Sequence, residues 1–291
     1  MRSIIFFLEF VVGGFWIVGI HVCTASETIS VGVNEPIFKG YEEITKNQSC
    51  RDVSEFDTIN HRGVIDVLLF CQALDRGGYD ATLELKKYPN YARSLFQAKI
   101  GEIDLPGETI WKTEIDPEFF LMSSPILRKG DLFFGIYTKI NRKDVLAVTN
   151  LEELQKYSTA VQKNWIVDME ILGKLGVKVE YIGKPESAWR MLAGDRIDFI
   201  LGGFAKDEKM EKHRAGIVAI PIPNLKLRVP GERRFALSKS NPNAMKILEA
   251  VEKGIRSLRE EGKILKAYTD RGYIKAETKN WKVLNPRVST P

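Results

Sequence analysis

The spacing of hydrophobic and polar positions changes several times along the chain, and each change predicts a different element. Residues 28–33 and 81–88 alternate between hydrophobic and polar side chains, which is typical of strands. Between them, residues 63–74 are apolar enough for a buried helix, and the polar stretch that starts at Asn34 predicts a long loop to about residue 60. Strands that alternate with helices predict a parallel α/β sheet with right-handed crossovers.

Residues 92–127 repeat this order in a compact form. Residues 92–100 have the hydrophobic spacing of one helical face, and Gly101 is suited to end that helix. Residues 103–105 predict a short strand, and the chain leaves regular structure at Ser123-Ser124-Pro125. This order brings side chains to the carboxyl edge of a sheet, where the ligands of open α/β sheets bind.

The pattern restarts after Pro125 and predicts a second α/β unit with its own core. The expected strands of this unit are residues 132–138, 159–161, 177–182 and 197–201, and its expected helices are residues 151–156, 167–175 and 185–193. The tail is expected to be extended at residues 217–222 and 235–238 and helical at residues 244–261 and 264–268.

The N-terminus has the order of a secretory signal. Arg2 precedes an apolar run over residues 4–22, and small residues end it at residues 23–25. We therefore expect a cleaved signal peptide over residues 1–25 and a periplasmic mature protein. An uncleaved membrane anchor is the alternative, because the run is nearly long enough to span a bilayer.

Cysteine usage agrees with export. Removal of the signal leaves Cys50 and Cys71, an even pair in an oxidising compartment, and we expect a disulfide between them. A catalytic thiol is the alternative, but no local histidine motif accompanies either cysteine.

Composition narrows the function classes. The chain has 291 residues and a net charge of +5, with 43 basic and 38 acidic residues spread along it. This mixed surface gives no concentrated patch for nucleic acid. No phosphate loop, zinc spacing or haem motif occurs in the sequence, so no metal and no cofactor are expected.

Several segments together resemble one family. They are VGV at 31–33, LFQAKIGEID at 95–104, SSPIL at 123–127, AWRMLAGDRIDFIL at 188–201 and the tail AVEKGIRSLREEGKILKAY at 250–268. With them the chain resembles the extracellular solute-binding proteins of family 3, the periplasmic group that binds polar amino acids. The resemblance implies a two-lobed periplasmic-binding-protein fold of type II, hinged at two crossovers near residues 128–132 and 233–236. Lobe one would comprise residues 26–129 and 234–291, and lobe two residues 130–233.

The resemblance also implies where a ligand would lie. The expected binding residues come from four segments that would face the cleft: Glu35, Phe38, Tyr41, Thr109, Trp111, Ser123, Ser124, Asn164, Trp165, Gly203 and Phe204. The first three would lie in a loop after the first strand. Asn164 and Trp165 would open a helix whose free N–H groups favour an anion. Each of these side chains could instead serve packing or capping.

The chain departs from the family at its charged contacts. Amino-acid binders carry an arginine shortly before the Ser-x-Pro exit, and Asp116 stands there in this chain. They carry an aspartate after the buried strand of lobe two, where this chain has Gly202-Gly203-Phe204 and no acid before Asp207. These departures argue against an ordinary zwitterionic α-amino acid and favour a ligand held by tryptophan faces, hydroxyls and a helix N-terminus.

Three functions remain open at this point. The first is a monomeric solute-binding protein that presents a small polar ligand to an ABC permease or a sensor kinase. The second is an enzyme on the same fold, of lyase or murein-cleaving type, for which the candidate acids and bases are Glu35, Glu108, Glu114 and Asp116. The third is an interaction module that has lost its ligand.

Overall fold

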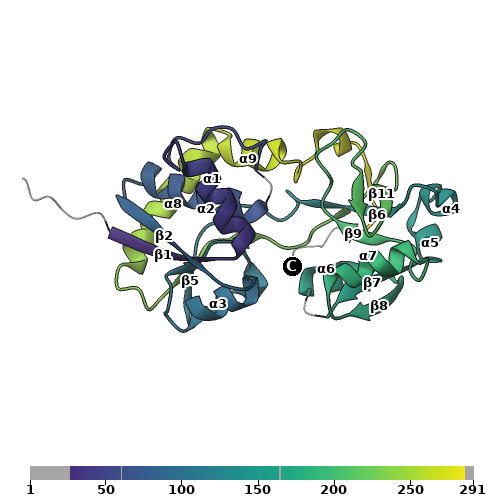
Figure 1. The fold of residues 1–291 in the computed structure, drawn as a ribbon, viewed down its shortest axis with the longest axis horizontal. Coiled ribbons are helices and arrows are strands. Elements are labelled where there is room, and N and C mark those ends of the chain that lie inside the picture. Colours follow the sequence, from purple (N-terminus) through teal and green to yellow (C-terminus); the bar gives the residue numbers. More distant parts are fainter. Residues whose placement is uncertain (1–26, 60, 164, 286–291) are drawn as a thin grey trace, which may run out of the picture.

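The computed structural model describes residues 27–59, 61–163 and 165–285. The expected signal peptide at residues 1–25 and the expected site residue Asn164 lie outside this part of the chain. Within it, two α/β lobes lie side by side and are joined by extended segments (Figure 1). None of the described helices has both the length and the apolar character required to cross a bilayer.

The first lobe is built on a three-stranded parallel sheet in the order β2-β1-β3. Its elements are β1 (Glu27–Val33), α1 (Glu35–Thr45), α2 (Arg62–Arg76), β2 (Ala81–Lys87), α3 (Tyr91–Lys99), β3 (Leu105–Pro106), α8 (Ala244–Glu260) and α9 (Lys263–Asp270). The central β1 pairs through Val31 with both Leu85 and Leu105. The predicted parallel sheet is therefore correct for this lobe.

Helix α2 forms the centre of the first-lobe core. All of its residues from Gly63 to Leu74 are buried, as the continuous apolar run predicted. It packs so closely on α8 that a Cβ added to Gly254 would lie 1.9 Å from the Ala73 carbonyl oxygen. Glycine is needed there because no side chain fits between the two backbones.

Residues 35–45 form helix α1, so the long loop predicted after β1 is wrong over these residues. Asn34 caps the helix, because its Oδ1 accepts a hydrogen bond from the Ile37 N–H at 3.2 Å. Pro36 lies in the first turn, where its missing N–H leaves no hydrogen bond unmade. Asn34 and Pro36 therefore start a helix where the polar stretch of the sequence predicted a loop.

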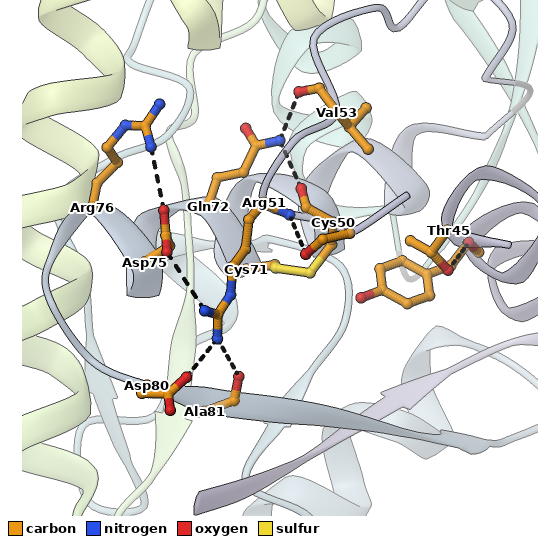
Figure 2. The surroundings of a disulfide bond; sticks show 12 residues. Thr45, Cys50, Arg51, Val53, Cys71, Gln72, Asp75, Arg76, Asp80 and Ala81 are labelled. Carbon is orange, nitrogen blue, oxygen red and sulfur yellow. Dashed lines mark hydrogen bonds and ion pairs between the residues drawn. A yellow bond between two sulfur atoms is a disulfide. The ribbon is translucent and has the colours of Figure 1, made fainter. Parts of the chain in front are cut away.

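The predicted disulfide between Cys50 and Cys71 is confirmed (Figure 2). It joins the loop after α1 to α2, and the two Cα atoms are 6.2 Å apart. The neighbouring Gln72 donates from Nε2 to the carbonyl oxygens of Cys50 and Val53, each at 2.9 Å. The loop is thus attached to the core helix by a covalent bond and by two buried hydrogen bonds.

The second lobe is mixed rather than parallel. Its elements are β6 (Phe133–Lys139), α4 (Lys143–Leu146), α5 (Leu151–Leu154), β7 (Ser158–Gln162), α6 (Ile166–Leu175), β8 (Lys178–Ile182), α7 (Pro185–Ala193), β9 (Ile200–Gly202), β10 (Lys212–Arg214), β11 (Ile217–Pro221) and β12 (Leu225–Arg228). β7 and β8 are parallel, but β6 pairs antiparallel with β9, β11 and β12. The prediction of a parallel sheet is wrong here.

A tight hairpin accounts for part of the antiparallel pairing. β10 and β11 are joined through Ala215 and Gly216, whose φ angles are 51° and 75°. Two successive residues with positive φ are typical of the turns that reverse a chain between antiparallel strands. The sequence analysis did not identify this turn.

Two extended connections run side by side between the lobes. β13 (Arg233–Arg234) pairs with β4 (Ile110–Trp111), and β14 (Ala236–Ser238) pairs with β5 (Phe120–Met122). The short helix η1 (Lys112–Glu114) follows β4. Arg233 also forms an isolated bridge with Leu127, so the two connections contact each other at the expected crossovers.

The end of the described chain returns to the second lobe. After η2 (Ala276–Thr278), β15 (Lys282–Val283) pairs with β12, and Leu284 packs in the second-lobe core. Residues 282–284 therefore pack with lobe two, whereas the whole tail was expected to belong to lobe one. The lobe boundaries proposed from the sequence otherwise stay a prediction.

Candidate ligand-binding cleft

Two adjoining cavities lie between the lobes and share Trp165, Asp168, Leu201 and Gly203. The first, here the Trp111 cavity, has a volume of about 710 Å³. Its polar and aromatic lining residues are Arg62, Tyr91, Glu108, Trp111, Glu114, Phe134, Trp165, Asp168 and Arg233. The second, here the Lys212 cavity, has a volume of about 540 Å³. Its charged lining residues are Asp168, Lys206, Lys212, Arg214 and Arg271.

The first-lobe wall of the Trp111 cavity is organised around Asp66. This carboxylate is fully buried, accepts from the Thr109 N–H at 2.8 Å and from the Tyr268 hydroxyl at 2.6 Å, and is paired with Arg62. Arg62 begins α2 one turn before Asp66, so the helix itself places the pair together. Nη2 of Arg62 also donates to Glu108 Oε1 at 2.9 Å.

Thr109 connects this cluster to the crossover. Its hydroxyl donates to Asp66 and accepts from Arg62 at 3.0 Å and from Nε of Arg233 at 3.1 Å. The guanidinium of Arg233 also donates to the Thr109 carbonyl oxygen and lies 4.3 Å from the centroid of the Trp111 ring. The two guanidinium groups are thereby held in fixed positions at the cavity wall.

The two arginines differ electrostatically. Burial opposes the charge of Arg62, but Asp66 and Glu108 outweigh it, and the pKa of Arg62 is raised above its usual range. The pKa of Arg233 is lowered, first by burial and then by the nearby charge of Arg62. Both groups remain charged at neutral pH, because the guanidinium pKa starts far above it.

Asp168 is the acid that the second lobe presents to both cavities. It lies in the first turn of α6, and burial raises its pKa to about 6. Within the described ranges, its carboxylate is in no ion pair. A negative charge at this helix start disfavours the anion that the sequence analysis expected there.

Lys212 is a basic residue of the second lobe that lines the Lys212 cavity together with Asp168. Burial lowers its pKa to about 8, and Nζ lies 4.1 Å from the centroid of the Tyr137 ring. It is in no ion pair with an acid of the described chain. The second-lobe wall therefore presents two half-buried charged side chains that are in no ion pair within the described residues.

The structure brings together four of the residues expected to bind ligand. Trp111 lines the first cavity, Trp165 and Gly203 line both, and Phe204 lines the second. Trp165 keeps 39% of its surface exposed, which leaves a ring face available where the two cavities meet.

Of the other expected residues, the six that the structure describes lie outside both cavities. Thr109 and Ser123 are fully buried, and Ser123 Oγ accepts from the Phe235 N–H at the crossover while Ser124 bonds to Glu252. Three of them lie on α1 rather than in a loop: Glu35 pairs with Lys39 and Lys87, and Phe38 and Tyr41 pack on the first-lobe core. Their binding roles stay predictions.

Of the four carboxylates considered for chemistry, Glu108 and Glu114 line the Trp111 cavity. Glu108 is paired with Arg62, and Glu114 accepts from the Tyr91 hydroxyl. Glu35 lies on α1, and Asp116 pairs with Lys99 at 3.1 Å outside both cavities.

Sequence reasoning did not identify Arg62, Asp66, Arg233, Asp168 or Lys212 as site residues. One signal was available: Asp66 follows Arg62 by four positions, one helical turn, at the start of a helix that is largely apolar. A charged pair in such a run must be buried together, because an isolated buried charge is too costly. The other three have no comparable local pattern.

Comparisons with known proteins support the fold. Neither the protein-family models nor the curated protein sequences match this chain. Among solved structures, the probable amino-acid ABC transporter extracellular-binding protein ytmK of Bacillus subtilis is 14% identical, with a TM-score of 0.59 over 85% of this chain and 98% of that one. The substrate-binding protein AbpA of Streptococcus pneumoniae, bound to L-arginine, is 17% identical, with a TM-score of 0.53 over 85% and 96%.

A third solved structure, the periplasmic VFT2 domain of BvgS from Bordetella pertussis, is 14% identical, with a TM-score of 0.56 over 85% of this chain and 93% of that one. At these identities the likeness shows a shared fold. The chain therefore has the two-lobed periplasmic-binding-protein fold that the sequence predicted.

Proposed function

We propose that this protein is a solute-binding protein that captures a small polar ligand between its two lobes. The observation that carries the proposal is the pair of cavities whose walls come from both lobes and from the crossover. Two lobes that both contact one ligand are drawn together when it binds, since closure completes the contacts.

The lining supports a polar ligand with an apolar part. Trp111 and Trp165 supply flat apolar faces, while Arg62, Glu114 and Asp168 supply charge. The charged anchors missing at the family's positions are thus replaced by charged residues from other positions. A charged, amino-acid-like solute consequently fits the cleft better than the sequence alone indicated.

Location and partner follow from the same proposal. The signal-like N-terminus and the disulfide between Cys50 and Cys71 support a periplasmic protein, where disulfides persist. The monomer would present its bound solute to an ABC permease or a sensor kinase. The solved structures of similar fold are binding proteins and a periplasmic domain, which supports binding rather than catalysis.

Thermal-shift screening of the mature protein against a metabolite library, followed by calorimetry on the hits, tests the proposal. A true ligand at about 100 times its Kd should stabilise the folded state by about 2.7 kcal/mol. The proposal is wrong if no small solute stabilises the protein.

A matched pair of variants shows whether a hit binds in the cleft. Trp165→Ala removes a ring that lines both cavities and should weaken binding about tenfold or more. Tyr181→Ala removes an aromatic of the same lobe that is 54% exposed and lines neither cavity, and it should leave the affinity unchanged. Equal losses in both variants would place the solute elsewhere.

A further inference from the structure

The Lys212 cavity is strongly basic. Of its charged lining residues, Lys206, Lys212, Arg214 and Arg271 are cations, and Asp168 is the acid. His61 and His213 also line it, and burial lowers the pKa of His61, which disfavours its charged form. Clustered charge of one sign in a cleft with apolar walls raises the local concentration of ions of the opposite sign.

Lys212 is half-buried, whereas the neighbouring Lys206 and Arg214 are exposed. Its Nζ lies close to the backbone of β9, because a Cβ added to Gly202 would be 2.8 Å from it. The Tyr137 ring covers Nζ on one side and is itself fixed, because its hydroxyl accepts from the Ala205 N–H at 3.0 Å. A cation–π contact offsets only part of the cost of burying an ammonium group.

Two of the neighbouring cations already have contacts of their own. Nζ of Lys206 donates to the Asp57 carbonyl oxygen at 2.8 Å, across the cleft from the second lobe to the first. Arg214 lies 5.8 Å from the centroid of the Trp189 ring. They strengthen the positive field, whereas Lys212 lines the cavity and is in no ion pair with an acid among the described residues.

We propose that Lys212 is the anchor for an anionic group of the bound solute, a carboxylate or a phosphate. The inference rests on the proposed function and specifies its ligand class. Within the Lys212 cavity, the anion lies at Lys212 rather than at the start of α6, because Asp168 holds a negative charge at that helix start. The rest of the solute extends past Trp165 into the Trp111 cavity.

The test observes Lys212 directly and needs no identified ligand. The lysines are reductively methylated with ¹³C-formaldehyde, and the dimethylamino resonances are followed by NMR while inorganic phosphate or acetate is added. The Lys212 resonance, assigned from its loss in Lys212→Met, should shift with a saturating response and titrate about one pH unit higher with the anion bound. A response to phosphate alone indicates a phosphate ligand, and a response to acetate indicates a carboxylate.

Lys178 is the control resonance, because its side chain is 76% exposed and pairs with Glu180 at the surface. If Lys212 responds no more than Lys178 to either anion, the inference is overturned. Asp168→Asn is the control variant, because it removes an acid rather than a cation from the cavity. Without this negative charge, the response of the Lys212 resonance to the anion should be at least as strong.

The solute screen separates this inference from the proposed function. A cleft solute should bind Lys212→Met at least about tenfold more weakly, as expected for the loss of a charge-assisted hydrogen bond. If the variant binds that solute unchanged, the anion anchor is wrong and the proposed function stands. If no solute binds the wild-type protein while Lys212 still responds to anions, the proposed function is wrong and the anion site stands.

Discussion

The two walls of the cleft hold their charges in different ways. On the first-lobe side, the charges of Arg62 and Asp66 are neutralised inside the protein and tied by hydrogen bonds to Thr109 and Tyr268. On the second-lobe side, Asp168 and Lys212 are half-buried without a partner of opposite charge in the described chain. The first wall is therefore a preorganised part of the folded protein, whereas the second carries partly buried charge whose cost a ligand can offset.

The largest expected effect is on the first wall. Asp66→Ala leaves the Arg62 charge without its helix partner and the Tyr268 hydroxyl without its acceptor, so it should lower the free energy of unfolding by about 3–5 kcal/mol. Urea denaturation measures this change. Asp80→Ala is the control, because Asp80 pairs with Arg51 while 71% exposed and should cost less than about 1 kcal/mol. Similar costs in both variants would show that the Asp66 cluster contributes little.

The next effect concerns the disulfide, which belongs to the first lobe. Replacement of Cys50 and Cys71 by serine opens a cross-link between residues separated by 21 positions and should cost about 3 kcal/mol. Hydrogen exchange should show the loss of protection in α2 and β1 before any loss in β7 and β8. If both lobes lose protection equally, they unfold as one unit and the comparison of their stabilities is invalid.

A substitution on the second wall is expected to raise the free energy of unfolding, by a smaller amount. Burial raises the pKa of Asp168 to about 6, so between about pH 4 and 6 the Asp168 carboxyl is protonated in the folded state and ionised in the unfolded state. The folded state is therefore favoured at low pH, and this stability is lost as the pH rises through about 6. Asp168→Asn should stabilise the ligand-free protein by about 1–2 kcal/mol at pH 7 and have no effect near pH 4.

Thermal denaturation of Asp168→Asn and wild type across this pH range checks the sign. Glu170→Gln is the control on the same helix, because Glu170 pairs with Lys174 on the exposed face. A stabilisation by Asp168→Asn that does not change with pH would mean that burial of the charge is not its cause.

The smallest expected effect is at α1. Glu35 contacts Lys39 and Lys87 on the surface and lines neither cavity, so Glu35→Gln should leave the affinity for a cleft solute within about twofold of wild type. Calorimetry with a solute found in the screen measures this. A large loss would restore Glu35 to the binding site that the sequence resemblance assigned to it.

Local patterns explain what could be predicted. The helix over residues 185–193 was expected with the observed ends, and the first strand was expected within one residue, because hydrophobic period and glycine or proline positions act over a few residues. Helix α1 was missed for the same reason: Asn34 and Pro36 end a strand and begin a helix at once.

The site was predicted less well, because its members meet only in space. Thr109 and Arg233 are hydrogen-bonded although 124 positions apart in the chain. The cavities are lined by Trp111, Trp165, Gly203 and Phe204, whose binding roles stay predictions. Lys212 lies on β10, and the antiparallel pairing of β10 with β11 was not expected from the sequence.

The sequence by itself determined the two-lobed α/β order, the disulfide partners and most helices, since each depends on nearby residues or on a single pair of cysteines. Tertiary structure decided which charges reach the cleft without a partner. Arg62 and Asp66 are neighbours on one helix and satisfy each other, whereas Asp168 and Lys212 reach the cleft from separate elements and are in no ion pair within the described residues. The energy of a buried charge depends on its distance to the opposite charge, and only the folded chain sets that distance.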